Sequence, residues 1–201
     1  MGRKIKRISM IVLYIIGIIL LLWLVLTLIA QMPRSSAAVE IGNTGAKSRS
    51  ALLVYNPDLF YDLDKKVCIA MAEGLESRDW SSRICTVSEA AKSELFAYDL
   101  YVFCANTYNW APDRPVSDFI RNFEMIRGKP VVAITLGSGS TVRSQQLLEE
   151  MIREKGGIIM ASETYWLMRP NDESRSGISN VQVAIEKSRM LGEKAAAMFD
   201  D

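Results

Sequence analysis

The sequence predicts one α/β domain, a doubly wound five-stranded parallel sheet, preceded by one N-terminal transmembrane helix. Three observations predict it: a charge-free apolar run near the amino terminus, five short apolar runs bounded by turn residues, and helical spacing between those runs. Once an anchor is subtracted, 201 residues leave room for one domain. We expect a basic N-terminus (1–7), a transmembrane helix (8–30), a linker (31–50) and the α/β domain (51–201).

The predicted anchor runs from Ile8 to Ala30 without a charged side chain. At a rise of about 1.5 Å per residue this run spans roughly 35 Å, enough to cross a hydrocarbon core. The alternative is a cleavable signal peptide, because the small residues Ser36, Ala37 and Ala38 follow. Apolar regions of signal peptides have about 7 to 15 residues, so a retained anchor is favoured.

Charge bias sets the expected orientation of this anchor. Four basic residues precede the span, and only Arg34 follows it closely. The positive-inside rule therefore places the amino terminus in the cytoplasm and the domain outside it. The three unpaired cysteines favour a reducing compartment, but we give the charge bias more weight. Residues 31–50 are rich in Pro, Ser and Gly and are expected to be a tether.

Five apolar, β-branched and aromatic runs are predicted strands. They lie at about 51–55, 83–87, 99–105, 130–136 and 157–161. The first, third and fourth are apolar nearly throughout, as strands buried on both faces are, and 83–87 is polar enough for an edge. Helical spacing fills the gaps, and the last helix begins with Ser179 and Gln182 in a capping box. Ligands of such sheets bind at the carboxyl ends of the strands.

Composition excludes several classes of function. The chain has no histidine, which removes Ser-His-Asp triads, Cys-His dyads and histidine metal sites. Outside residues 1–34 the chain carries 19 basic and 23 acidic side chains with no basic cluster, so we expect no nucleic-acid partner. Cys68, Cys85 and Cys104 each lie in an apolar run and are expected to be buried and unreactive.

The segment after the third predicted strand carries two aromatic residues, Tyr108 and Trp110, where a ligand would bind. By itself it is consistent with a rigid proline-containing connection. It also resembles the flavodoxin family, in which the third strand is followed by Thr-Tyr, a short stretch, prolines and a helix bearing Phe. The matching residues, in order, are Thr107, Tyr108, Trp110, Pro112, Pro115 and Phe119.

The resemblance runs from about residue 50 to 198 and implies a flavodoxin-like sheet that binds FMN. It implies that the third loop supports the isoalloxazine ring and that the loop after the fourth strand faces the ring's other side. The implied cofactor-binding residues are Asn106, Thr107, Tyr108, Asn109, Trp110, Leu136, Gly137, Ser138 and Gly139. Ser140 or Thr141 is expected to cap the helix that follows. Tyr165 and Trp166 either add a lid or pack within the domain.

The first loop departs from the family pattern. A flavodoxin's first loop is rich in Ser, Thr and Gly and wraps the FMN phosphate, whereas residues 56–64 contain none of these and include three aspartates. Asp62 or Asp64 is expected to cap the following helix. A magnesium site formed by Asp58, Asp62 and Asp64 is a weaker alternative, because no further pattern supports it.

Two functions of different classes follow. The first is a membrane-anchored flavodoxin-like protein that binds FMN and transfers electrons to or from a redox partner protein. The second is a flavin-free interaction module at the membrane, which the first loop favours. A hydrolase is a distant third, because there is no histidine to act as a base. The sequence leaves open whether the chain is an enzyme.

Overall fold

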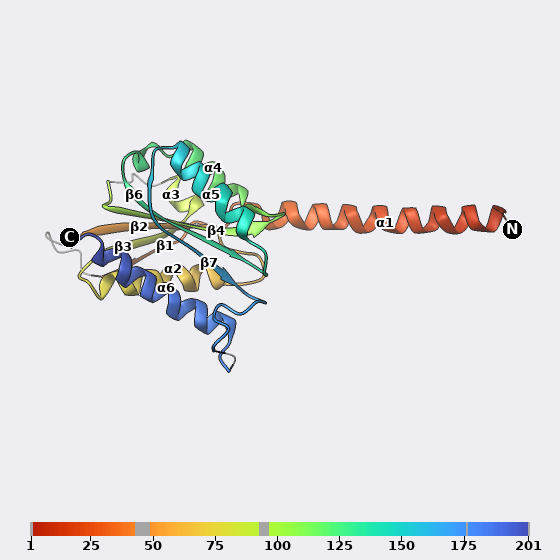
Figure 1. Cartoon of the computed structure of the whole chain (residues 1–201). Helices are drawn as coiled ribbons and strands as arrows, with labels where there is room; N and C mark the ends of the chain where they lie inside the picture. Colours follow the sequence, from red (N-terminus) through yellow and green to blue (C-terminus); the bar gives the residue numbers. More distant parts are fainter. Residues whose placement is uncertain (1, 43–48, 93–96, 176, 201) are drawn as a thin grey trace. The chain divides into compact units, whose positions relative to one another are not determined.

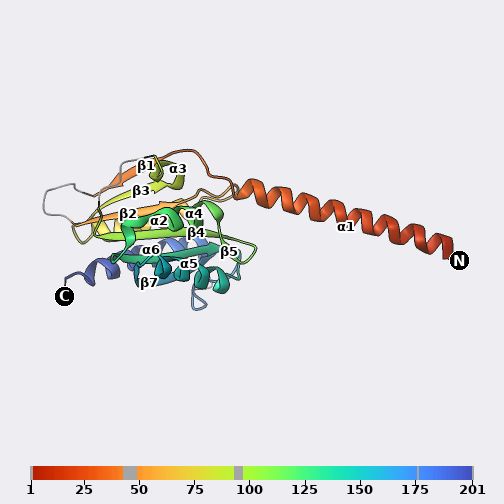
Figure 2. The same ribbon diagram turned by 90° about the horizontal axis from the view of Figure 1, so that it is seen from above.

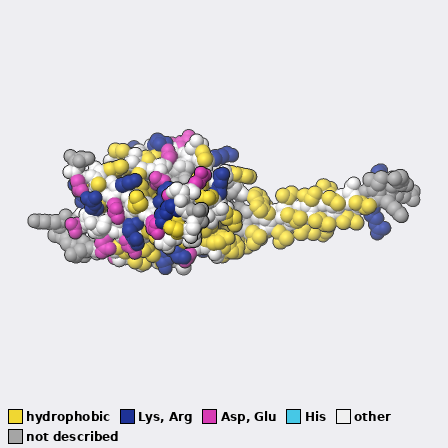
Figure 3. Space-filling view, turned by 60° about the horizontal axis from the view of Figure 1, so that its bottom comes forward, with side chains coloured by type: hydrophobic (Ala, Val, Ile, Leu, Met, Phe, Trp, Pro, Cys, Tyr) yellow, Lys and Arg dark blue, Asp and Glu magenta, His cyan; other side chains and the backbone are white. Residues whose placement is uncertain are grey.

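The computed structural model describes residues 2–42, 49–92, 97–175 and 177–200. The chain divides into two compact units, residues 1–32 and residues 33–201. The first unit contains a single helix, α1 (Gly2–Ala30). Within it, Lys6–Ala30 is long and apolar enough to cross a membrane, with a mean hydropathy of 3.0 and no buried side chains over the most apolar stretch. Its surface is almost wholly hydrophobic (Figure 3).

The second unit is a sheet covered by helices on both faces (Figures 1 and 2). Its elements follow in chain order. They are β1 (Ala38–Ile41), β2 (Ser50–Tyr55), α2 (Leu63–Glu76), β3 (Ser81–Thr86), α3 (Val87–Ala90), β4 (Leu100–Tyr108), β5 (Ala111–Pro112), α4 (Arg114–Asn122), the 3-10 helix η1 (Glu124–Ile126), β6 (Pro130–Gly137), α5 (Val142–Glu154), β7 (Ile158–Trp166) and α6 (Asn180–Ala197).

Five parallel strands form the main part of the sheet, in the order β3-β2-β4-β6-β7, and β1 and β5 pair antiparallel with β3 and β4. The chain winds outward from β2 in both directions, so the order reverses between β2 and β4. This doubly wound arrangement confirms the predicted fold class. The crevice at the carboxyl ends of β2 and β4 is where such sheets bind ligands.

The two faces of the sheet are filled by alternate residues of the same strands. Leu53 of β2 belongs to the core cluster that includes side chains of α2 and α6, while Leu52 and Val54 belong to the cluster that includes side chains of α4 and α5. All three side chains are fully buried, which explains why the run has no polar alternation. Figure 1 shows α2 and α6 on one face and α4 and α5 on the other. The cysteines Cys68, Cys85 and Cys104 are buried and unpaired, as predicted.

Two glycines let α2 and α6 approach each other closely. A Cβ added at Gly74 would lie 2.0 Å from the carbonyl oxygen of Arg189, and one at Gly192 would lie 2.2 Å from that of Met71. Ser188 adds a hydrogen bond from its hydroxyl to the Val67 carbonyl oxygen, at 2.8 Å. The helix pair that covers one face of the sheet is therefore fixed by backbone contact.

The edge of the sheet differs from the prediction. Residues 83–87 were expected at an edge, but β1 pairs antiparallel with β3 and covers it, from Ala38 opposite Cys85 to Ile41 opposite Ser82. β1 lies within 31–50, where a tether was expected, while 43–48 of that range lie outside the described residues. The polar composition of 31–50 concealed a strand whose side chains are mostly exposed, because only its backbone is needed for pairing.

Three helix beginnings also differ in detail from the prediction. Asp62 occupies the N-cap of α2 without a side-chain capping bond, and instead its carboxylate pairs with Lys66 at 2.9 Å. Thr141 occupies the N-cap of α5, also without a capping bond. The helix that bears Phe119 was expected after the prolines, but it begins at Arg114, has Pro115 in its first turn and is capped by Asp113. The Ser179 cap is as predicted, since its hydroxyl accepts from the Gln182 amide at 3.2 Å.

Candidate functional site

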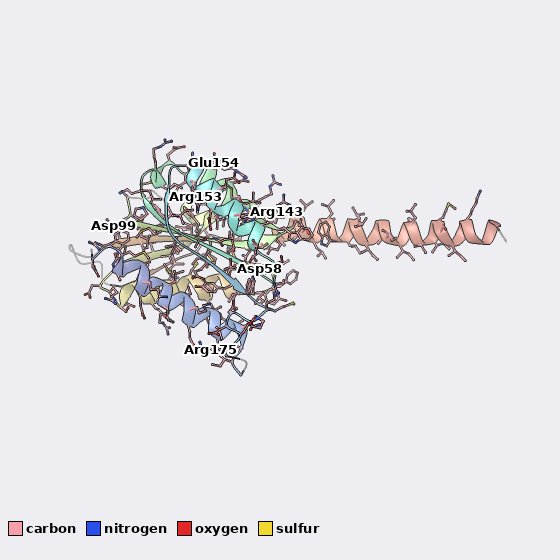
Figure 4. All side chains as sticks on the ribbon, viewed as in Figure 1. Asp58, Asp99, Arg143, Arg153, Glu154 and Arg175 are labelled. Carbon is pink, nitrogen blue, oxygen red and sulfur yellow. The ribbon has the colours of Figure 1, made fainter. Side chains whose placement is uncertain are left out.

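A pocket lies at the carboxyl ends of β2, β4 and β6, where the strand order reverses. Its volume is about 240 Å³. Eleven residues line it: Asp58, Phe60, Tyr61, Leu63, Asn106, Thr107, Tyr108, Leu136, Gly137, Ser138 and Leu167. Figure 4 shows Asp58 at this end of the sheet, with Arg143, and Asp99 at the opposite end.

The segment after β4 is a tight hairpin. β4 extends beyond its predicted end to Tyr108 and pairs with β5, so that Thr107 opposes Pro112 and Tyr108 opposes Ala111. The two residues at the turn, Asn109 and Trp110, have φ of +53° and +59°. Positive φ at both central positions is the geometry of a type I′ turn, which matches the twist of the paired strands.

Trp110 is unusual at this position. Left-handed backbone suits asparagine but is costly for a bulky residue. Sixty per cent of Trp110 is exposed, so burial of the ring in the domain does not offset that cost. The structure thus holds an exposed, strained aromatic residue beside the pocket.

Asn106 and Asp113 join the hairpin to the neighbouring loops. The Asp113 carboxylate accepts from the amides of Asn106 at 2.8 Å and Val116 at 3.0 Å. The Asn106 side-chain amide donates to the Asn56 carbonyl oxygen at 2.9 Å and to the Asp64 carboxylate at 3.0 Å. One buried network therefore fixes the ends of β2 and β4 and the beginnings of α2 and α4.

Burial shifts the titration of three groups in this network. It raises the pKa of Asp113 to about 7, although the two amide hydrogen bonds act in the opposite direction. Burial likewise raises the pKa of Asp64 above its usual value. The pKa of Tyr108 is raised by burial and then by its hydrogen bond to Asp58, so its hydroxyl stays protonated at neutral pH.

The first loop carries its own anion. One carboxylate oxygen of Asp58 accepts from the amides of Phe60 at 2.7 Å and Tyr61 at 3.1 Å. The other accepts from the Tyr108 hydroxyl, which links this loop to the hairpin across the pocket. The Asp58 amide in turn donates to the Asp64 carboxylate at 2.6 Å.

The loop after β6 is held against the end of β7. The carbonyl oxygens of Gly137 and Ser138 accept from the amides of Leu167 at 3.0 Å and Met168 at 3.1 Å. A Cβ at Gly137 would lie 2.6 Å from the Thr141 methyl group and 3.3 Å from the Thr107 Cβ. Close packing against Thr141 at the start of α5, and less tightly against the hairpin, therefore favours glycine there.

Six of the nine predicted cofactor-binding residues line the pocket: Asn106, Thr107, Tyr108, Leu136, Gly137 and Ser138. Asn109 and Trp110 form the hairpin turn, and Gly139 lies one residue beyond Ser138. Tyr165 and Trp166 belong to β7 rather than to a lid. Tyr165 is fully buried, and the Trp166 indole N–H donates to the Thr141 hydroxyl at 2.9 Å.

Five lining residues were not among the predicted cofactor-binding residues: Asp58, Phe60, Tyr61, Leu63 and Leu167. Phe60 and Tyr61 are 68% and 49% exposed, so their rings are open to solvent at the pocket. Two adjacent aromatics in the loop after the first predicted strand were the signal that could have identified Phe60 and Tyr61, since this loop lies at the switch point. Leu167 lies in the connection after β7, and no sequence pattern marked it.

The pocket fits one part of FMN and not the other. The lining combines aromatic and apolar side chains with backbone groups of the hairpin and of the loop after β6, and such a lining suits a planar ring. A phosphate needs unoccupied amides or cations, but the first-loop amides of Phe60 and Tyr61 already bind Asp58. Among the described residues, no group of three or more His, Cys, Asp or Glu side chains is arranged to hold a metal ion.

Comparison with known proteins bears on the fold. No protein-family model matches the sequence, and a search of curated protein sequences found no match. Solved structures do match. A flavodoxin from the domain Archaea is 14% identical, with a TM-score of 0.51 over 76% of this chain and 99% of that one.

Two further solved structures agree with this match. A flavodoxin, WrbA-like protein from Agrobacterium tumefaciens is 15% identical, with a TM-score of 0.55 over 76% of this chain and 97% of that one. A short-chain flavodoxin associated with a non-canonical PDU bacterial microcompartment is 16% identical, with a TM-score of 0.55 over 74% and 99%. The domain that follows the N-terminal apolar helix therefore has a flavodoxin-like fold.

Proposed function

We propose that this chain is a membrane-anchored flavodoxin-like electron-transfer protein whose carboxyl-edge pocket holds the ring of a flavin. The observation that carries the proposal is Trp110, an exposed aromatic in strained backbone beside the pocket. Strained residues cluster at functional sites, where the surrounding structure maintains them. An Asn-Gly turn would make the same hairpin without strain, so the indole is expected to act outside the fold.

The ring of the flavin would supply the redox chemistry, and this chain would position and shield it. In this proposal the Tyr108 and Trp110 side chains contact one face of the ring, together with backbone of Asn106, Thr107 and Asn109. Residues 136–139, at the end of β6 and in the loop after it, face the other side. FMN is the flavin that the family resemblance implies, although the first loop does not fit its phosphate.

The membrane is part of the same proposal. α1 would cross the bilayer, because its apolar stretch is long enough and has none of its side chains buried. The basic residues before it would hold the amino terminus in the cytoplasm, leaving the domain on the other side. Tethering would keep the flavin close to a redox partner protein in or at the same membrane.

The test is flavin retention by the full-length protein in lipid nanodiscs, measured by visible absorbance after incubation with flavin and dialysis. Trp110→Gly is expected to weaken flavin binding at least about tenfold while raising the free energy of unfolding by about 1 kcal/mol, because it relieves left-handed strain. Trp110→Phe keeps an aromatic ring and is expected to retain most of the binding. Undiminished binding by Trp110→Gly would contradict the site assignment.

The second candidate function is a flavin-free interaction module at the membrane. The Asp58 carboxylate on the first-loop amides favours it, because a loop that supplies its own anion needs no ligand phosphate. Full-length protein that is folded by circular dichroism and remains colourless with every flavin tested would support this candidate and contradict the first.

A further inference from the structure

The first-loop amides are the feature from which the inference starts. Successive backbone N–H groups in a loop between a strand and a helix form a ready anion site. Here the anion is internal, because Asp58 Oδ1 accepts from the Phe60 amide at 2.7 Å and the Tyr61 amide at 3.1 Å. A ligand phosphate would have to displace this carboxylate to reach those amides.

Asp58 is also held from other directions. Its second carboxylate oxygen accepts from the Tyr108 hydroxyl, and its amide donates to Asp64 at 2.6 Å. Asp64 is itself buried and bound by the Asn106 side chain at 3.0 Å. Displacing Asp58 would break several charge-assisted hydrogen bonds and bring a phosphate close to two carboxylates.

The pocket itself has room for a ring and little more. Its volume of about 240 Å³ is below the roughly 300–1,000 Å³ of sites that enclose a drug-sized ligand. Much of its lining is apolar or aromatic, including Phe60, Tyr61, Leu136 and Leu167. These surfaces favour stacking and hydrophobic contact with an uncharged planar ring.

We propose that Asp58 takes the place of a ligand phosphate, so that the pocket selects phosphate-free ring ligands, riboflavin rather than FMN. The selectivity rests on the proposed function, because it assumes that the pocket binds a flavin ring. Asp58 acts here as a specificity-determining residue: it satisfies the loop amides and repels a phosphate that approaches them.

The experiment measures dissociation constants of riboflavin and FMN, each by equilibrium dialysis against the full-length protein in nanodiscs of zwitterionic lipid. The wild-type protein is expected to bind riboflavin at least about tenfold more tightly than FMN. The reason is that Asp58 occupies the amides of Phe60 and Tyr61 and its charge repels the FMN phosphate. Asp58→Ala frees the amides and removes the charge, so the preference for riboflavin is expected to fall about tenfold.

A matched control removes the same charge from the same loop. Asp62 lies four residues away, its side chain is 68% exposed, and its carboxylate pairs with Lys66 rather than with the loop amides. Asp62→Ala is expected to change the ratio of the two dissociation constants less than about twofold. If Asp58→Ala does not fold, Asp58→Asn serves instead, with a smaller expected fall because it keeps an acceptor on the amides.

The outcomes separate this inference from the function on which it rests. Wild-type binding of FMN as tight as that of riboflavin, or tighter, would overturn the role of Asp58 and leave the proposed function standing. A riboflavin preference that the folded Asp58 variant does not reduce would also overturn it. Binding of neither flavin would overturn the proposed function, and the selectivity with it.

Discussion

At the residue scale, the candidate site depends on buried polar groups that satisfy one another. Asp113 is fully buried, yet its carboxylate caps α4 and also binds the Asn106 amide. Capping bonds favour the ionised carboxylate and burial disfavours it, and burial has the larger effect on the pKa. Asp64 and Asp58 raise the pKa of Asp113 further. The network is therefore sensitive to pH near neutrality.

The expected result is a loss of stability as pH rises toward 7. The pKa of Asp113 is 3.8 in the unfolded chain and about 7 in the folded one, so between these values only the folded state keeps the proton. The contribution of Asp113 to the free energy of unfolding is therefore fully present below about pH 4. It decreases by up to about 1.4 kcal/mol per pH unit until about pH 7. Asp113→Asn cannot titrate and is expected to lack this decrease.

Urea unfolding of a fragment beginning at Pro33, at pH 5, 6, 7 and 8, measures the effect. The exposed Asp118, which pairs with Arg121 at the surface, provides the control substitution Asp118→Asn. The pH profile of that control is expected to follow the wild type. Parallel profiles for the wild type and Asp113→Asn would show that the Asp113 titration does not contribute.

At the element scale, β1 makes part of the predicted linker a structural part of the domain. Its pairing with β3 is extended by neighbouring bonds, in which the Ala37 carbonyl oxygen accepts from the Thr86 amide at 3.0 Å and the Ala37 amide donates to the Thr86 hydroxyl at 3.1 Å. The Arg34 amide also donates to the Asn56 side chain at 3.2 Å. The segment before β1 thus reaches the residue at which the first loop begins.

A fragment that starts at Lys47 is therefore expected to be less stable than one that starts at Pro33. It lacks β1 and leaves the edge of β3 unpaired, which removes several backbone hydrogen bonds worth about 1 kcal/mol each and exposes a strand edge to self-association. Thermal unfolding and size-exclusion chromatography of the two fragments measure both effects. Equal melting temperatures would mean that β1 contributes little to the domain.

At the scale of the whole molecule, two physical regimes share one chain. The side chains of residues 8–30 in α1 are almost all exposed and apolar. The surface of the domain seen in Figure 3 instead mixes acidic and basic groups without a large area of one charge. An exposed helix of this composition is stable in a bilayer and not in water, because only lipid offers its side chains an apolar surrounding.

The full chain is expected to stay in the membrane pellet after an alkaline carbonate wash, while the fragment from Pro33 to Asp201 appears in the supernatant. Leu20→Arg combined with Leu22→Arg places two charges near the middle of α1. Each charge costs about 2.5–3.5 kcal/mol of membrane-insertion free energy, so the double variant is expected to be released from the membrane. The intact mass of the purified protein is the second measurement. A mass equal to that of a chain starting after residue 36, 37 or 38 would indicate a cleaved signal peptide instead of an anchor.

The sequence by itself determined the α/β class, the five parallel strands, the apolar helix and six residues of the pocket. The class, the strands and the helix follow from local properties: hydrophobic period, run length and turn residues. The six pocket residues were implied by the resemblance of the chain to the flavodoxin family. Only the tertiary structure decided the rest. β1 is identified by its pairing with β3, because its side chains are mostly exposed and give no hydrophobic pattern. The left-handed turn at Asn109 and Trp110 follows from the pairing of β5 with β4. Asp58 meets Tyr108, fifty residues away, because the fold brings the ends of β2 and β4 together.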